Sequence, residues 1–327
     1  MFLFTYSRLL WLFVVFLSSV LYGHGGFCIM FCMDKNFEPS IKLNLARNCL
    51  RYAVRLYHIK EMYVPYYICP VVFKVLREEG CRIRIYHIDE KFFPVQDFGK
   101  EDFVLYPNYF GICLKNAKKL SFLYKNLIVD NAQAFYAPHT GLASFNSARK
   151  FFDVSDGAYL FGCKKFYQEF EKDNSEKRYS ALFSGSSSDF FERFCTNEKI
   201  LDKEPVKEMS YLTERILSSV DYEREAKKRR ENFDYLHSCL KYHNELCFEL
   251  EEDDVPMVYP FKVSDERVGK RLVSEGFELI RYWEGVYGEC YERELAHYLL
   301  PLPVSAKYEV SYMRKLIDII KDEIKLL

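Results

Sequence analysis

The chain has 327 residues, 49% of them apolar and 28% charged, and this composition excludes intrinsic disorder over most of its length. Its 46 Lys and Arg residues nearly balance 47 Asp and Glu residues, so the net charge of -1 does not indicate a nucleic-acid-binding protein. Eleven cysteines are scattered without a C-x-x-C pair or a zinc-type spacing to histidine, which indicates reduced thiols and no metal site.

An apolar run opens the chain. Residues 9–22 (LLWLFVVFLSSVLY) follow Arg8 and resemble the hydrophobic region of a signal peptide, but are shorter than the ~20 residues of a spanning helix. Three interpretations stay open: an export signal or anchor, a buried or dimer-contact helix, or an upstream mis-start with Met30 or Met33 as the true beginning. We treat residues 1–33 as a separate segment and expect a cytoplasmic protein, with membrane tethering through residues 1–22 as the alternative.

The next part of the chain alternates short apolar strands with amphipathic helices. The strands are predicted at residues 61–64, 82–88, 102–106, 127–129 and 158–161, and the helices at 48–58, 71–79 and 114–124. This alternation predicts an α/β domain over residues 34–215, with a mostly parallel sheet flanked by helices. Ligands of such sheets bind at the carboxyl ends of the strands.

The rest of the chain predicts a smaller α+β domain over residues 216–327. Residues 173–188 are polar and serine-rich, which predicts a mobile loop, and residues 210–242 predict one long charged helix. Its KKRR run at 227–230 is interpreted as a solvated face rather than an anion site. Strands at 258–263 and 277–282 and helices at 264–275, 289–299 and 308–327 complete the domain.

The candidate catalytic and cofactor-binding residues lie between positions 129 and 160. Asp130 ends an apolar strand, where a carboxylate needs a positive partner such as a protonated pyridine nitrogen. Lys150 lies beside two phenylalanines, a setting that lowers a lysine pKa and favours a Schiff base, and Ser144 and Ser147 precede it as phosphate donors. Together they describe a pyridoxal phosphate site. On spacing alone, a capping Asp, a surface Lys and turn serines remain the other interpretation.

The order of several motifs adds a family resemblance. The chain resembles the DegT/DnrJ/EryC1/StrS sugar aminotransferases of pyridoxal phosphate fold type I from about residue 41 to its end. The resemblance implies a large domain with a mostly parallel, seven-stranded type of sheet and a smaller α+β C-terminal domain. The segments that carry the resemblance are LARNCL (45–50), VPYYICP (64–70), YHIDEKFFP (86–94), YPNYFG (106–111), VDNAQAF (129–135), SFNSARKFFDVSDGA (144–158), YPF (259–261) and LPLPVSAKY (300–308).

The resemblance implies roles around the pyridoxal phosphate ring. Asp130 would keep the pyridine nitrogen protonated, Gln133 would contact the 3-oxygen side, and Lys150 would bind the cofactor covalently and shuttle a proton. The family spacing from serine to lysine is commonly five residues, which from Ser144 leads to Arg149. We choose Lys150 because the acid-glycine step at 156–157 then falls at the usual distance.

The phosphate end departs from the family. Ser144 or Ser147 would bind the phosphate, helped by the backbone amides of Arg47 and Asn48 at the start of the first helix. The family's Gly-Thr or Gly-Ser pair is Ala46-Arg47 here, which removes one hydroxyl. The position that often stacks an aromatic ring on the cofactor is Cys69, so that Tyr67 or Tyr66 would stack instead.

The resemblance implies transfer of an amino group, expected from glutamate, to a keto-sugar carried on a nucleotide in surface polysaccharide or other glycan assembly. Family members are homodimers, and residues 207–217 are expected to cross that interface. Retention of Lys150 favours transamination over dehydration, because the related dehydratases carry histidine there. The alternative function is a catalytically inactive homologue that binds a nucleotide sugar or scaffolds glycan assembly.

Overall fold

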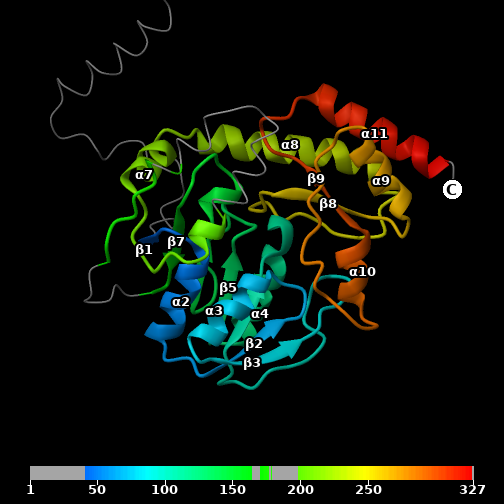
Figure 1. The fold of residues 1–327 in the computed structure, drawn as a ribbon. Helices are drawn as coiled ribbons and strands as arrows, with labels where there is room; N and C mark the ends of the chain where they lie inside the picture. The colour runs from blue at the N-terminus through cyan, green and yellow to red at the C-terminus, as the bar shows by residue number, and fades with distance from the viewer. Residues whose placement is uncertain (1–40, 164–169, 177, 179–197, 326–327) are drawn as a thin grey trace, which may run out of the picture. The chain divides into compact units, whose positions relative to one another are not determined.

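The computed structural model describes residues 41–163, 170–176, 178 and 198–325, and the apolar run at 9–22 lies outside them. Its main feature is a seven-stranded sheet in the order β1-β7-β6-β5-β4-β2-β3 (Figure 1). Strands β2 to β6 pair in parallel, whereas β1 and β7 run antiparallel to their neighbours. The mostly parallel sheet predicted from the sequence is thus confirmed. The strands are β1 (Ile41–Leu43), β2 (Glu61–Pro65), β3 (Arg82–Tyr86), β4 (Val104–Pro107), β5 (Leu127–Asn131), β6 (Ala143–Asn146) and β7 (Ala158–Phe161).

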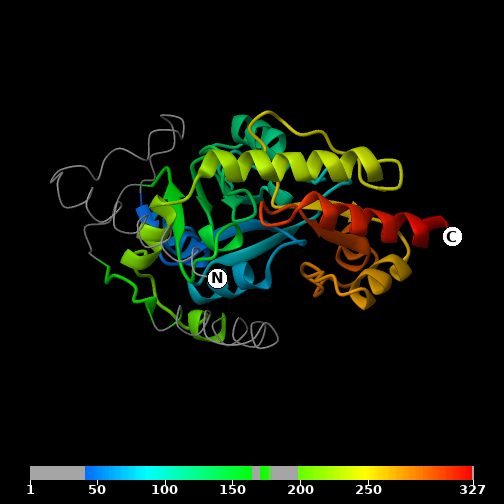
Figure 2. The ribbon, with the colours of Figure 1, turned by 90° about the horizontal axis from the view of Figure 1, so that it is seen from above.

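Helices cover both faces of the sheet. α2 (Ala46–Leu56) and α3 (Pro70–Glu78) lie on one face and α4 (Leu114–Leu123) on the other (Figure 2). The connection from β2 to β3 runs toward one edge of the sheet, and the connection from β4 to β5 runs toward the other edge. Because crossovers between parallel strands are right-handed, the helices in these two connections, α3 and α4, lie on opposite faces. The adjacent strands β2 and β4 therefore mark a topological switch point, where open α/β sheets bind their ligands.

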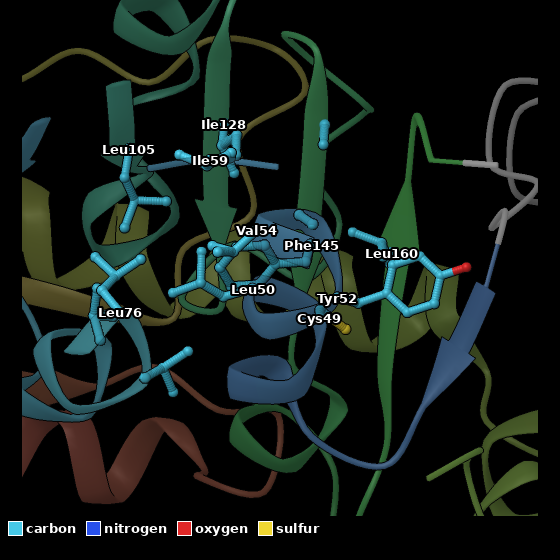
Figure 3. Packing of buried hydrophobic residues seen from close by; sticks show 14 of the residues in the cluster. Cys49, Leu50, Tyr52, Val54, Ile59, Leu76, Leu105, Ile128, Phe145 and Leu160 are labelled. Atoms are coloured by element: carbon cyan, nitrogen blue, oxygen red, sulfur yellow. The ribbon is translucent and has the colours of Figure 1, made fainter. Parts of the chain in front are cut away.

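The core lies between α2 and the sheet (Figure 3). Helical periodicity places Cys49, Leu50, Ala53 and Val54 on one buried face of α2. They pack against side chains from the central strands, each at most 2% exposed: Leu105, Ile128, Phe145 and Leu160. Burial of each large apolar side chain stabilises the fold by about 1.5–3 kcal/mol, so this contact fixes where the first turn of α2 lies at the sheet edge.

The C-terminal part is built around a two-stranded antiparallel sheet, with α8 and α11 packed against each other (Figure 1). Its elements are α7 (Tyr211–Ser218), α8 (Tyr222–Leu240), β8 (Val258–Lys262), α9 (Glu266–Ser274), α10 (Tyr291–Tyr298), β9 (Leu299–Pro303) and α11 (Val310–Lys325). Among the residues that the structure describes, every helix is too short or too polar to span a membrane. All eight cysteines in these residues are free thiols.

Two predicted elements differ in the structure. The long helix over 210–242 is two helices, because Ser210 and Asp221 each cap a new N-terminus by accepting a hydrogen bond from a backbone amide two or three residues inside it. The strand predicted over 277–282 is irregular, since β8 pairs with β9 and left-handed backbone at Gly276 and Trp283 bounds the segment.

The basic run at 227–230 is not a solvated face throughout. Arg229 is 2% exposed, and its guanidinium donates to the carbonyl oxygens of Met257 and Phe151 at 3.4 and 3.2 Å. Arg230 donates to the carbonyl oxygen of Asp254 at 2.6 Å. The predicted loop over 173–188 is described only at its start, where Asp173 and Arg178 form a buried ion pair of 2.9 Å; its remainder lies outside the described residues.

Candidate functional site

The carboxyl ends of β2 and β4 carry packed aromatic side chains. Tyr67 follows β2 and Tyr109 follows β4; the Tyr109 hydroxyl donates to the Tyr67 carbonyl oxygen at 3.0 Å and the two rings stack at 6.0 Å. Trp283 from the C-terminal part packs edge-on to Tyr67, with 4.6 Å between ring centroids. Tyr67, expected from the sequence to stack on a cofactor, therefore already packs against two rings of this chain.

Asp130 lies at the same edge of the sheet. It is the penultimate residue of β5, in register with Pro107 at the end of β4, and its Oδ1 accepts a hydrogen bond from the Ala132 amide at 2.8 Å. Burial raises the pKa of the Asp130 carboxyl above its usual range, and the nearby positive charge of Lys150 partly offsets this rise. Asp130 forms no ion pair with any residue that the structure describes, so its carboxylate lacks a fixed cation.

Lys150 and Arg149 have opposite environments. Both belong to the short 3-10 helix η2 (Ala148–Lys150), which follows β6. Lys150 is exposed, and its amine makes no hydrogen bond or ion pair within the described residues. Arg149 is 14% exposed and pairs with Glu198. Burial, followed by the charge of Arg47, lowers its pKa to about 10. Of the two candidates for the lysine position, only Lys150 offers a free amine near Asp130.

Four buried polar atoms just beyond β2, β4 and β5 have no partner among the described residues: Tyr67 Oη, Asn108 Nδ2, Asn131 Oδ1 and Gln133 Nε2. Their residues are at most 4% exposed. A buried polar atom without a hydrogen bond costs about 1–3 kcal/mol, so such a group of atoms marks a place for a polar ligand or water. Gln133 is itself held in place, because its Oε1 accepts from the Phe110 amide at 2.9 Å.

The turn after β4 fixes that glutamine. Phe110 and Gly111 adopt left-handed backbone with φ of 57° and 73°. A Cβ on Gly111 would lie 2.7 Å from the Val255 carbonyl oxygen and 2.8 Å from that of Gln133, so only glycine fits. This bracing of Gln133 was not predicted; the glycine that closes the YPNYFG motif was its only signal in the sequence.

The first turn of α2 is occupied by contacts within the chain. Arg47 pairs with Asp202 at 2.5 Å and with Glu198 at 3.4 Å. The Asn48 side-chain amide donates to Asn44 Oδ1 at 2.9 Å and to the Pro205 carbonyl oxygen at 2.8 Å, and the Asn48 backbone amide donates to the Leu45 carbonyl oxygen. The side chains of Arg47 and Asn48 are thus bound to protein groups, and so is the Asn48 backbone amide that was expected to face a phosphate.

The two candidate serines lie in different places. Ser144 is the second residue of β6, beside Val129, and its hydroxyl forms a 2.9 Å hydrogen bond with Nδ1 of His139, which lies in the loop that enters the strand. Ser147 follows the strand, caps η2 and is 6% exposed, with no hydrogen bond to its hydroxyl among the described residues. The structure therefore brings Ser147, and not Ser144, to the edge where Lys150 lies.

Asp156 organises the loop after Lys150, a role that the sequence did not reveal. It is fully buried and accepts hydrogen bonds from the backbone amide and hydroxyl of Ser210, both at 2.8 Å, and from the Thr213 hydroxyl. Segment 207–217, expected to cross a dimer interface, thus binds Asp156 of its own chain through Ser210 and Thr213. Arg229 supports the same loop through the Phe151 carbonyl oxygen, next to Lys150.

Comparison with known proteins rests on structure alone, because no family model and no curated protein matches the chain. A DegT DnrJ EryC1 StrS aminotransferase from Brucella abortus superposes with a TM-score of 0.59 at 13% identity over 97% of this chain and 95% of its own. Spr1654 from Streptococcus pneumoniae, described as a sugar aminotransferase in its PLP form, gives 0.60 at 13% identity over 88% and 87%. PseC from Helicobacter pylori, an aminotransferase of pseudaminic acid biosynthesis, gives 0.56 at 11% over 88% and 86%.

These superpositions extend from the sheet into the C-terminal part and agree with the predicted fold class. The resemblance found in the sequence motifs is confirmed at the level of the fold. The chain has the fold of the DegT/DnrJ/EryC1/StrS-type sugar aminotransferases.

Proposed function

We propose that this protein is a pyridoxal phosphate-dependent aminotransferase that acts on a keto-sugar. The observation that carries the proposal is the Asp130 carboxylate, which is half-buried at the sheet edge without an ion pair among the described residues and lies near the free amine of Lys150. In a chain with this fold, a half-buried acid and an unpaired lysine beyond the ends of adjacent strands are groups that this cofactor requires.

The residues around Asp130 fit the ring of the cofactor. Asp130 would accept a hydrogen bond from the protonated pyridine nitrogen, Gln133 Nε2 would donate to the 3-oxygen, and Lys150 would bind the cofactor covalently and carry a proton during transfer. When bound, the cofactor supplies an electron sink that makes a proton on the substrate's amino carbon acidic.

The phosphate would bind beside Ser147 and the first turn of α2. The Ser147 hydroxyl is available for a hydrogen bond, and the positive end of the helix dipole favours an anion at this position. Arg47 would contribute only after release from Glu198 and Asp202. We therefore propose that the cofactor is held mainly through its ring and Lys150.

The finer assignment follows the structural neighbours, whose names include a sugar aminotransferase and an enzyme of pseudaminic acid biosynthesis. We propose a nucleotide-linked keto-sugar as acceptor, glutamate as amino donor, and a cytoplasmic homodimer that works in glycan biosynthesis. A divergent homologue that binds a nucleotide sugar without turnover is the second candidate. The pairing of Arg47 and Asn48 with protein groups favours that second candidate, because it leaves the phosphate few side-chain donors.

The test is the first half of the reaction. Full-length protein loaded with pyridoxal phosphate and mixed with glutamate should convert the cofactor to its amino form, seen by absorbance, with one 2-oxoglutarate released per site. Lys150→Ala should release none, whereas Lys125→Ala, which removes an exposed lysine paired with Glu101, should behave as wild type. Cofactor binding without 2-oxoglutarate, also with aspartate and alanine as donors, would support the non-catalytic homologue.

A further inference from the structure

A second group of side chains, all with metal-ligating atoms, lies at the end of β3, outside the site described above. His87 directly follows β3, and Cys290 and Glu292 lie at the start of α10. His87 Nδ1 lies 3.0 Å from Glu292 Oε1, and one ligand atom from each of the three residues lies within 4.8 Å of the other two. An imidazole nitrogen, a sulfur and a carboxylate oxygen thus converge from two distant parts of the chain.

Glu292 is the most unusual member of the group. It is 1% exposed, and its Oε1 accepts a hydrogen bond from the Ile88 amide at 2.9 Å. Within the described residues, no lysine or arginine pairs with this carboxylate, and His87 is its only basic partner. A buried carboxylate without a fixed positive charge is costly, and a bound cation would relieve that cost.

The other two side chains leave access for an ion. The His87 side chain is 50% exposed and packs edge-on against the Tyr66 ring at 5.6 Å. Cys290 is half-buried, with its sulfur 3.8 Å from the Tyr287 carbonyl oxygen. Burial and the adjacent Glu292 raise the pKa of the Cys290 thiol, so coordination would release its proton to solvent.

We propose that His87, Cys290 and Glu292 bind a zinc ion, with water as the fourth ligand. Thiolate, imidazole and carboxylate together suit Zn²⁺, whereas Mg²⁺ and Ca²⁺ prefer oxygen ligands alone. Ligand atoms around tetrahedral zinc lie about 3.5 Å apart, so rotation of the exposed His87 and of Cys290 brings the present separations into range. The Ile88 amide holds Glu292 in place, as groups behind a metal ligand commonly do.

The ion would join the sheet edge to the segment that precedes α10. Tyr66, after β2, already receives a hydrogen bond from the Tyr287 amide at 3.0 Å, and the same segment carries Trp283 onto Tyr67. Zinc bound beside these contacts would hold the segment that precedes α10 against the aromatic residues at the carboxyl ends of β2 and β4. Spacing rules could not reveal the site, because His87 and Glu292 are 205 positions apart in the chain. The inference is independent of the proposed transaminase activity.

The test measures zinc binding directly. Full-length protein, reduced and freed of metal with a chelator, is titrated with Zn²⁺ against a chromophoric competitor, in parallel with Cys290→Ser, His87→Asn and the control Cys247→Ser. Cys247 is an exposed thiol outside the group. Wild type and Cys247→Ser should bind one more equivalent than the other two variants, or bind it at least about 100-fold more tightly, as expected for loss of one ligand.

Cobalt(II) supplies an independent signature. Wild type and Cys247→Ser should show a thiolate-to-cobalt charge-transfer band that Cys290→Ser lacks, and Zn²⁺ should raise the melting temperature of wild type but not of His87→Asn. Because His87 is exposed, its substitution keeps the fold, which circular dichroism would verify. Equal zinc stoichiometry and affinity in wild type, His87→Asn and Cys290→Ser would overturn the proposal, as would a metal-free wild type that takes up no Zn²⁺.

Discussion

The two halves of the candidate site differ in how their polar groups are satisfied. On the ring side, made of Asp130, Gln133 and Lys150, the carboxylate has no ion pair, the Gln133 Nε2 atom has no acceptor, and the amine has no partner among the described residues. On the phosphate side, made of Arg47, Asn48 and Arg149, the side chains are bound to acidic residues or backbone carbonyl oxygens of this chain.

This difference indicates which half has kept the features of a binding site. Unpaired buried groups reduce stability and persist where a ligand completes them, whereas groups that pair within the protein contribute to the fold. We infer that a cofactor would be recognised through its ring and held weakly at its phosphate. Each prediction below tests one half against the other.

The largest effect is expected from Lys150→Ala. Loss of the free Lys150 amine near Asp130 should lower the rate of amino transfer by at least about 10³-fold, because both the covalent link and the proton carrier are removed. The measurement is single-turnover release of 2-oxoglutarate. Arg149→Ala is the informative companion and should retain turnover: if it abolishes turnover while Lys150→Ala retains it, the two neighbouring residues have been assigned in the wrong order.

Asp130→Asn should weaken cofactor binding and at the same time stabilise the cofactor-free protein. Loss of the charged contact to the pyridine nitrogen should weaken cofactor affinity by roughly 10–100-fold. The cofactor-free protein should become more stable at neutral pH, since burial raises the pKa of this carboxyl and so disfavours its charged form. Cofactor titration and urea unfolding measure the two effects.

Asp254→Asn is the matched control, because burial raises the pKa of this carboxyl to about 6 while the Glu251 and Leu114 amides bind it. A folded-state pKa above the unfolded value near 4 means that folding takes up a proton between these values, so wild type loses stability as the pH rises from 4 to 6. The free energy of unfolding of wild type should fall by up to about 3 kcal/mol over this pH range, whereas that of Asp254→Asn should not. The variant should bind the cofactor as tightly as wild type. Weakened cofactor binding in both variants would indicate general damage.

Glu198→Gln should strengthen the binding of the cofactor's phosphate. It removes the carboxylate shared by Arg47 and Arg149, and should tighten cofactor affinity by about 3–10-fold at some cost in stability, since a partly buried ion pair is broken. Fluorescence titration gives the affinity, and Glu204→Gln, which breaks a partly buried pair with Lys207 away from these arginines, is the control. An unchanged affinity in Glu198→Gln would mean that these arginines do not face the cofactor.

The smallest effect is expected from the serines. Ser147→Ala should weaken the binding of pyridoxal phosphate by about 3–10-fold, the value of one hydrogen bond, without affecting pyridoxal, which has no phosphate. Ser144→Ala should leave both affinities unchanged and reduce only stability, because its hydroxyl binds His139. The reverse result would mean that Ser144, and not Ser147, binds the phosphate.

Periodicity and strand length were enough to predict five of the seven strands of the large sheet, because buried strands such as β4, β5 and β7 are short apolar runs bounded by turn residues. They did not predict β1 and β6. The break between α7 and α8 could not be predicted in this way, because Ser210 and Asp221 lie within a continuous helical pattern and only their caps divide it. β9 was not predicted, because the proline-rich sequence after the helix expected over 289–299 forms a strand only opposite β8.

For the site, the end of a strand led to Asp130 and the neighbouring phenylalanines led to Lys150, while Gln133 came from the family resemblance; these signals are local in the sequence. The pairing of Arg47 with Glu198 and Asp202 was beyond reach, since it joins residues more than 150 positions apart. The same limit applies to Asp156, whose partners Ser210 and Thr213 come from α7 and its cap. Long-range polar contacts leave no periodic signal in a sequence.

The most direct test is to locate the covalent link. Full-length protein is incubated with pyridoxal phosphate, reduced with borohydride, digested and mapped by mass spectrometry. The account predicts one modified peptide per chain, with the cofactor on Lys150, in wild type and in Ser144→Ala. Modification spread over exposed lysines such as Lys125, with Lys150 no more labelled than the rest, would contradict it.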